Sequence, residues 1–249
     1  MATGITTEPA AKLSDRLIAI RDRWHCKKHP FYGELSVGGL DFGHLGTFLV
    51  QHYLVVRQIF RSIGLAYAKA PDDIARNIIE NLAEEAGLVG IDGHEAHNHT
   101  DLILAFTRHC GIDDGAVRDG ELLPTWLARA ALMRWITEAE PAAIRIAVQA
   151  STESQLVGEN GEVVVPALVR HYGFREDDPT IGFFTEHAFA DVKHGNEMYD
   201  LVDRHVVSED DKRRAEIWTT RMCKLRWASF NELYRETVEG IRLEDTLPR

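Results

Sequence analysis

The sequence contains little cysteine, no excess of basic residues and no long apolar run. Its three cysteines, Cys26, Cys110 and Cys223, are odd in number and lack CxxC spacing, so neither a disulfide framework nor a thiolate zinc site is indicated. The formal net charge of −11 lacks the basic footprint that attracts nucleic acid or an anionic membrane surface. No window approaches roughly 18 consecutive apolar residues, and no signal peptide is recognisable. We therefore expect a cytoplasmic protein whose partner is a small-molecule substrate, with no nucleic acid and no membrane.

Apolar residues recur at helical spacing along most of the 249 residues. Asp41 is well placed to cap the N-terminus of one long helix. The longest expected helices cover residues 45–63, 181–205 and about 210–241. The only β-like run, VVVPALV, contains Pro166 and would make a poor central strand. The pattern predicts an all-α fold in which residues 1–249 form a single bundle of about eight helices, with residues 1–10 as a flexible tail. A homodimer is compatible with this pattern, although no apolar stripe requires it.

Histidine is abundant, with twelve residues in the chain. The segment EHAFADVKHG places His187, Asp191 and His194 at positions i, i+4 and i+7. On an α-helix these positions fall within an arc of roughly 60°, so all three side chains share one face. Two imidazoles and a carboxylate suit iron or manganese, although zinc is chemically possible. The alternative is a helix face on which these side chains make ordinary hydrogen bonds.

A dinuclear site in a helical bundle needs further carboxylate and histidine ligands from facing helices. Glu153 belongs to an apolar helix, AAIRIAVQASTESQL, where a carboxylate is costly to bury unless it is paired or bound to metal. Its alternative role is a surface glutamate near a helix end. A third region, NLAEEAGLVGIDGHEAHNHTDLI, contains Glu84, Glu85, Asp92, His94, Glu95, His97 and His99. Much of it fits a solvated polar loop, but His99 directly precedes an apolar helical run and is the histidine best placed to face the core.

The ordered set NLAEEAG, HTDLILAFTRHCGI, TESQ and HAFADVKH resembles the haem-oxygenase-like dimetal oxidases, a family related to the pyrroloquinoline-quinone synthase and thiaminase-II folds. The resemblance extends from about His29 to His205 and rests on motif order and on the gaps between motifs. It implies a haem-oxygenase-like helical bundle. It also implies that the metal ligands, which are the catalytic residues, are Glu85, His99, Glu153, His187, Asp191 and His194. The segment between the first two holds three glycines and is longer than is usual in the family, so Glu84 and Glu95 remain alternatives for the first carboxylate.

The resemblance further implies two Fe²⁺ ions as cofactors and dioxygen as co-substrate. The expected enzyme is a non-haem diiron oxidoreductase of specialised metabolism. It would oxidise a small amine, amino acid or fatty acid by N-oxygenation, oxidative C–C cleavage or desaturation. Arg57 and Arg145 are candidate anchors for a substrate carboxylate. Tyr53 and Trp24 either line the pocket or pack in the core.

Three other functions remain open from the sequence. The first is a metal-independent oxidase like pyrroloquinoline-quinone synthase, against which the three carboxylates count. The second is thiamine-degrading hydrolysis, which needs a nucleophilic cysteine, and neither Cys110 nor Cys223 stands in a histidine-carboxylate pattern. The third is a non-catalytic helical binding protein, in which the shared face of His187, Asp191 and His194 would be accidental.

Overall fold

The computed structural model describes residues 11–90 and 95–247, apart from the side chains of residues 189–194. The tail expected at residues 1–10 lies outside this range. The described residues form eleven α-helices: α1 (Leu13–Arg23), α2 (Pro30–Ser36), α3 (Phe42–Tyr67), α4 (Asp72–Glu85), α5 (His99–His109), α6 (Asp114–Asp119), α7 (Pro124–Ala139), α8 (Ala142–Glu159), α9 (Val165–His171), α10 (Gly182–His205) and α11 (Glu209–Thr237). The expectation of an all-α fold is confirmed.

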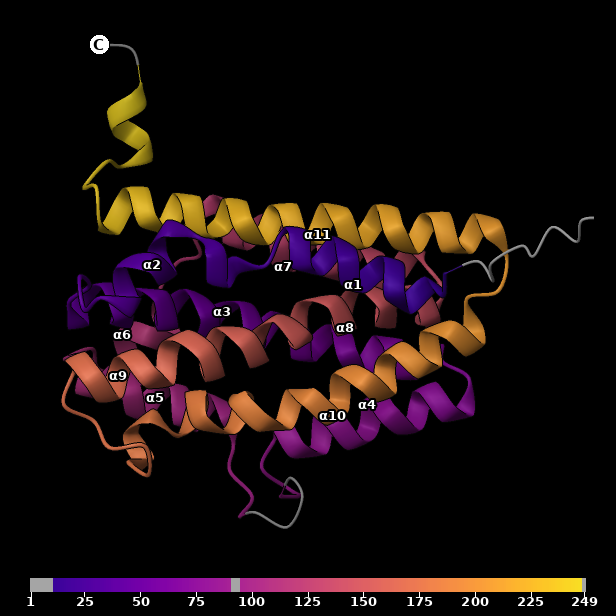
Figure 1. The fold of residues 1–249 in the computed structure, drawn as a ribbon, viewed down its shortest axis with the longest axis horizontal. Coiled ribbons are helices and arrows are strands. Elements are labelled where there is room, and N and C mark those ends of the chain that lie inside the picture. The colour runs from indigo at the N-terminus through magenta and orange to yellow at the C-terminus, as the bar shows by residue number, and fades with distance from the viewer. Residues whose placement is uncertain (1–10, 91–94, 248–249) are drawn as a thin grey trace, which may run out of the picture.

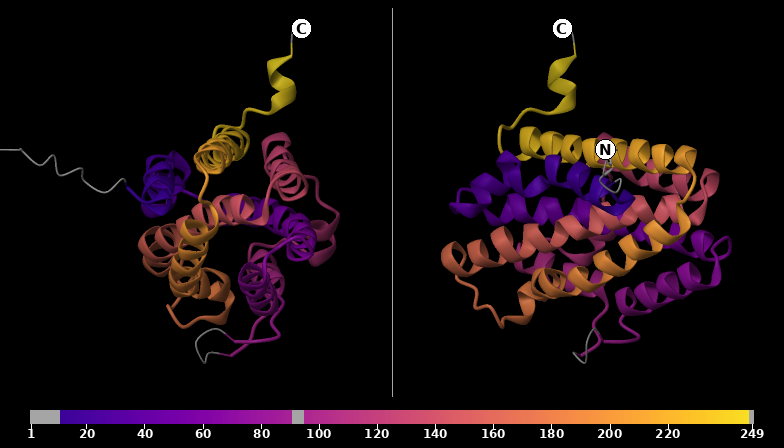
Figure 2. Two further views of the ribbon diagram at one scale, coloured as in Figure 1. Left: turned by 90° about the vertical axis from the view of Figure 1, so that its right-hand side faces the viewer. Right: turned by 45° about the vertical axis from the view of Figure 1, so that its right-hand side comes forward.

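Helix α8 lies at the centre of the bundle. It packs against α10, α11, α1 and α7, and the long helices run side by side along the long axis of the molecule (Figures 1 and 2). Most residues of α8 are buried, on nearly every side of the helix, as expected for a helix surrounded by others. Any polar side chain on α8 that points inward is therefore enclosed by protein.

Local sequence signals account for several helix boundaries. The Asp41 carboxylate accepts a hydrogen bond from the His44 backbone N–H at 2.9 Å, and the His44 ring is hydrogen-bonded to the Asp41 N–H at 3.0 Å. This reciprocal cap confirms the predicted start of α3. Ser208 caps α11 in a similar way by accepting from the Asp211 N–H.

The expected number of about eight helices is too low. Short helices α2 and α6 form in segments that read as turns, because Pro30 and Asp113 provide good helix starts although only a few residues follow. The last long helix ends at Thr237 instead of Ile241. The β-like run around Pro166 contains no strand: a π-helical turn at Asn160–Val164 leads directly into α9, which has the proline in its first turn.

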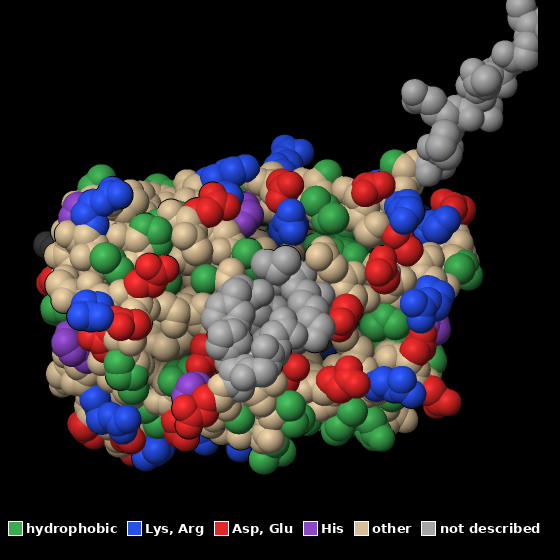
Figure 3. All heavy atoms as spheres, turned by 60° about the horizontal axis from the view of Figure 1, so that its bottom comes forward, with side chains coloured by type: hydrophobic (Ala, Val, Ile, Leu, Met, Phe, Trp, Pro, Cys, Tyr) green, Lys and Arg blue, Asp and Glu red, His purple; other side chains and the backbone are tan. Residues whose placement is uncertain are grey.

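Among the described residues, no helix combines the length and the apolar character needed to cross a membrane. Figure 3 shows acidic and basic side chains interspersed on one face of the molecule, without a continuous patch of either sign among the side chains drawn in colour.

Candidate metal centre

The end of α4 and the start of α5 are held together at the base of the glycine-rich segment. Ala86 and Asn98 form an isolated backbone bridge, and the Asn98 side chain donates to the Ala86 carbonyl at 3.2 Å. The same side chain caps α5 by accepting from the Thr100 N–H at 2.9 Å. Gly87 has a φ of 70°, and a Cβ at this position would lie 2.5 Å from the Asn98 nitrogen. Only glycine fits this approach, which brings the last residue of α4 next to the first residue of α5.

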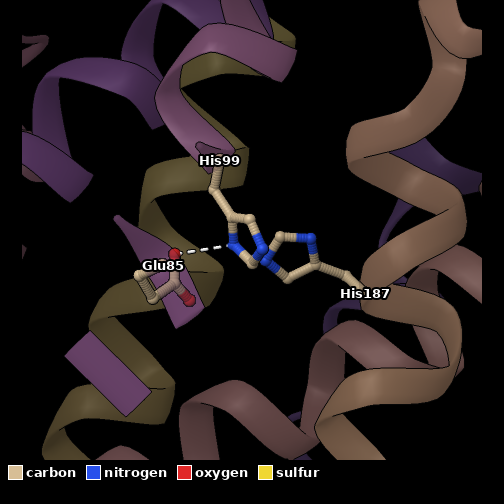
Figure 4. Close-up of side chains that lie close together, drawn as sticks. All are labelled: Glu85, His99 and His187. Carbon is tan, nitrogen blue, oxygen red and sulfur yellow. Dashed lines mark ion pairs between the residues drawn. The ribbon is translucent and has the colours of Figure 1, made fainter. Parts of the chain in front are cut away.

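Three side chains from three helices converge at this point. Glu85 ends α4, His99 begins α5, and His187 comes from α10 across the bundle (Figure 4). One possible ligand atom from each of the three lies within 4.8 Å of the other two. Metal–ligand bonds of about 2.0–2.2 Å allow two ligand atoms on one ion to be up to about 4.4 Å apart. A shift of a few tenths of an ångström would therefore let one ion contact all three.

The His187 ring is held in the form that a metal ligand needs. Its Nδ1 lies 2.7 Å from the Phe183 carbonyl oxygen. Because a carbonyl oxygen can only accept, Nδ1 must carry the proton, and Nε2 keeps its lone pair. Burial, with a smaller contribution from His99, lowers the pKa of His187 to about 4, so the ring is neutral at neutral pH.

The His99 ring occupies a strongly acidic environment. Its Nδ1 lies 2.7 Å from Glu85 Oε2, and its Nε2 lies 3.5 Å from Glu186 Oε2. Burial alone would lower the pKa of His99, but Glu85 and Glu186 together outweigh burial and raise the pKa to about 10. In the metal-free protein His99 is therefore an imidazolium that neutralises nearby carboxylates. A bound cation would take over this role and displace the proton.

Glu153 lies on α8 and lines the same cavity as the cluster. Its carboxylate accepts from the Gln149 amide, while its Oε2 is buried and has no hydrogen-bond partner among the described residues. Burial raises the pKa of Glu153 to about 7, although the Gln149 hydrogen bond opposes the rise. A buried carboxylate oxygen without a partner is costly. Together with the free lone pair of His187, this oxygen shows that the residues present fit a cation.

The remaining candidates for ligands are placed less completely. Asp191 and His194 lie on α10, but their side chains are outside the described residues. Glu95 has an 86% exposed side chain beside His97 and precedes α5, because the Asn98 cap starts the helix after it. Glu95, one of the alternatives for the first carboxylate, therefore does not lie on the helix that carries His99. Glu84 is partly buried, but Glu85 is the residue that contacts His99.

A cavity of about 90 Å³ adjoins the cluster. Its apolar wall comes mainly from α3, through Val56, Ile59, Phe60 and Ile63. Arg145 lines this cavity, as predicted for a residue bordering the site, but Arg57 is exposed and lies beside the Arg118 carbonyl oxygen at 3.5 Å. Tyr53 and Trp24 are not among the cavity residues. Tyr53 is buried in the core and Trp24 packs edge-on against Trp227.

Sequence reasoning missed several residues of the site. Glu186 holds both His97 and His99, yet its only signal was its position next to His187. His52 is buried against Phe183 on the inward face of α3, where its spacing among apolar residues could have revealed it. Arg129 is buried and lines the cavity, with its guanidinium 4.8 Å from the centre of the Trp126 ring.

The three cysteines do not form a nucleophilic site. All are reduced, and Cys26 and Cys223 are buried. Burial raises the pKa of Cys110 and of Cys223 to about 12, and that of Cys26 still further. A thiolate nucleophile at neutral pH is therefore disfavoured, which counts against thiamine-degrading hydrolysis.

Comparisons with known proteins identify the fold and the family. The structure superposes on a domain of unknown function with a haem-oxygenase-like fold from Shewanella denitrificans, with a TM-score of 0.77 at 16% identity, covering 97% of this chain and 100% of the other. The fold is therefore the haem-oxygenase-like α-helical fold. A family model described as "Iron-containing redox enzyme" matches residues 46–227. The chain belongs to this family of iron-containing redox enzymes.

Two curated relatives carry the same name. A 4-aminobenzoate synthase of Chlamydia muridarum is 29% identical over 208 residues, which cover 82% of each chain. A 4-aminobenzoate synthase of Nitrosomonas europaea is 22% identical over 231 residues, which cover 89% of this chain and 90% of the relative.

Proposed function

We propose that the chain is a non-haem dimetal oxygenase that binds two iron ions through Glu85, His99, Glu153, His187, Asp191 and His194. The observation that carries this proposal is the convergence of Glu85, His99 and His187 from three helices, next to a buried Glu153 oxygen that lacks a partner. Three carboxylates and three histidines leave positions open on two ions. Iron in such a set supplies electrons to dioxygen, chemistry that no amino-acid side chain can perform.

The protein's own residues prepare the site for this chemistry. The Phe183 carbonyl orients the His187 ring, and Glu186 contacts the rings of both His97 and His99. The wall formed by α3 and α5, which includes Ile59 and Ile103, presents apolar atoms to the cavity, and such a surface disfavours bound water. A dry, shaped cavity strengthens electrostatic interactions within it and protects a reactive centre from side reactions.

The relatives' name supplies a first product to assay. We propose a small amine, amino acid or other organic acid as the substrate, and 4-aminobenzoate as the first product to seek. Expression of the chain in a bacterium that cannot make 4-aminobenzoate tests that product, with growth on minimal medium as the readout. A chain that binds iron and consumes oxygen but does not restore growth would act on another member of this substrate class.

Metal binding is tested by anaerobic titration with Fe²⁺. The parent protein is expected to bind two equivalents, and Glu153→Ala and His187→Ala are expected to lose at least one of them. His109→Ala and Glu80→Ala are matched controls, because both residues are exposed and lie on α5 and α4 respectively. If the two site variants bind as much iron as the parent, the dimetal assignment is wrong.

A further inference from the structure

We propose that Arg145, which lines the cavity two helical turns before Glu153 on α8, binds the carboxylate of a short organic acid. The iron centre of the proposed function would then act on a small carboxylic acid with an apolar body. That this acid is a substrate rests on the proposed function, whereas the carboxylate site rests on Arg145 and its surroundings alone.

The Arg145 guanidinium is buried without enough partners. Its side chain is on α8 in the middle of the bundle, and the residue is 1% exposed. One nitrogen, Nη1, donates to the Gln149 side-chain oxygen. The other two, Nε and Nη2, are buried and have no hydrogen-bond partner among the described residues. A buried guanidinium with unsatisfied donors is costly, and the cost is relieved by a ligand that accepts from both nitrogens.

A carboxylate is the ligand that fits these two nitrogens. Nε and Nη2 stand on one edge of the planar guanidinium and match the two oxygens of a carboxylate in a bidentate pair. No described carboxylate forms an ion pair with Arg145, although Glu153 lies two turns further along the same helix. Burial lowers the pKa of Arg145 to about 10, which leaves it cationic at neutral pH. The site therefore has charge, geometry and vacant donors for an external anion.

The spacing along α8 connects this anchor to the candidate metal centre. Arg145, Gln149 and Glu153 follow one another at intervals of four residues, and each contacts the next. Four residues of α-helix rise about 6 Å. Because the guanidinium reaches Gln149, a carboxylate bound there stands about one helical turn from Glu153. A short acid would span the distance between the two groups.

The cavity walls restrict the remainder of the acid. Ile59, Ile63 and Met133 line the cavity, so the body of the ligand meets mainly apolar atoms. The volume of about 90 Å³ is smaller than the ~150 Å³ cavity that accepts benzene in an engineered protein. Met133 and Met222 are flexible and can adjust around a flat ring. The volume therefore favours a short acid, aliphatic or with a single ring where the two methionines shift, over a long fatty acid.

A second buried arginine makes a useful comparison. Arg129 is 7% exposed, lines the same cavity and stacks on Trp126. It stands close to Arg226, which is already paired with Glu159 at 2.5 Å. The indole face partly satisfies Arg129, whereas Arg145 has two donors enclosed without a partner. We therefore assign the carboxylate to Arg145.

The test measures binding of benzoate and butanoate to the full chain after removal of metal by a chelator, so that the acids cannot bind iron. Calorimetry or ligand-observed NMR gives the affinity, with benzamide and butanamide as neutral analogues of similar shape and dodecanoate as the long acid. The parent is expected to bind at least one short acid at least 10-fold more tightly than its amide and to reject dodecanoate. Equal affinity for acid and amide, or no binding of either short acid, overturns the proposal.

Variants locate the site. Arg145→Met keeps a long apolar side chain, removes a charge that is costly to bury, and is expected to fold and to weaken acid binding at least 10-fold. Arg145→Lys, which retains the charge but not the bidentate edge, should be intermediate, and the exposed Arg57→Gln should bind like the parent. If acid binding survives in Arg145→Met but is lost in Arg129→Gln, the carboxylate binds at the other arginine and the proposal is wrong.

The outcomes for this site and for the proposed function are separable. Arg145→Met is expected to bind two equivalents of Fe²⁺ like the parent, since Arg145 is not a proposed ligand. Failure of the parent to bind iron, with acid binding still dependent on Arg145, removes the oxygenase proposal and leaves the carboxylate site. Normal iron binding without acid binding overturns the carboxylate site and leaves the oxygenase proposal.

Discussion

Replacement of Glu153 by glutamine is expected to stabilise the metal-free protein while it weakens iron binding. Burial raises the pKa of this carboxyl from 4.5 to about 7. A shift of about 2.5 units, at 1.36 kcal/mol per unit, corresponds to about 3 kcal/mol. Keeping the ionised carboxylate in the folded metal-free protein therefore costs about 3 kcal/mol, which neutral glutamine avoids.

The effect has a defined pH dependence. The unfolded chain releases the Glu153 proton near pH 4.5, and the folded metal-free chain releases it near pH 7. Between these values the folded state holds more protons, so its stability falls as pH rises through this window. Glu153→Gln does not share this loss. The variant should match the parent below about pH 4.5 and exceed it by up to about 3 kcal/mol at pH 8.

Urea unfolding in the presence of a chelator, at pH 4.5 and pH 8, measures this difference. Glu80→Gln is the control, because Glu80 is an exposed carboxylate on α4 and its substitution should leave the pH dependence unchanged. A stability difference between Glu153→Gln and the parent that is the same at both pH values would refute the reasoning. Anaerobic Fe²⁺ titration of the same variant should show the opposite sign, as weaker binding than in the parent.

Three further outcomes are expected. Gly87→Ala places a Cβ 2.5 Å from the Asn98 nitrogen at a φ of 70°. It should destabilise the protein by at least about 1–2 kcal/mol and weaken iron binding. The control is Gly64→Ala at an exposed position of α3, which should instead stabilise the protein by about 0.5–1 kcal/mol in urea unfolding. Binding of Fe²⁺ at pH 7 should release protons and tighten as pH rises, because the pKa of His99 is raised to about 10 and His99 must lose its proton to bind metal. Calorimetry in buffers of different ionisation enthalpy counts the released protons. Metal binding without proton release would contradict this protonation state of His99. Burial raises the pKa of Cys223 to about 12. Alkylation of Cys223 at pH 8, followed by mass spectrometry, should therefore be roughly 100-fold slower in the native chain than in the urea-unfolded chain. Equal rates would show an accessible thiolate.

Helical periodicity alone identified most of the fold. The apolar spacing across α3 and the cap at Asp41 depend on residues within a few positions of one another, so the sequence was sufficient to predict them. The short helices α2 and α6 were missed because two turns or fewer carry too little periodicity. The end of α11 was misplaced by four residues because helix termini fray and their signals are weak.

The two candidate carboxylate anchors show where local pattern is insufficient. Arg57 and Arg145 are both arginines on long helices that border the cavity, and nothing near them in the sequence distinguishes their surroundings. Packing turned Arg57 to solvent and enclosed Arg145 in the bundle. Burial depends on which helices cover a face, and α8 is covered on nearly every side.

The sequence by itself determined the all-α fold and predicts a common helical face for His187, Asp191 and His194, because a helix repeats over short distances. The assembly of Glu85, His99 and His187 from three helices, with the Glu186 support and Arg145 in the cavity wall, required the tertiary structure. The glycine-rich segment between Glu85 and His99 illustrates the difference. Its length made the first carboxylate ambiguous, and only the close approach of Gly87 to Asn98 showed that Glu85 and His99, at the two ends of the segment, lie side by side. Contacts between residues far apart in the chain depend on packing, which short-range spacing does not encode.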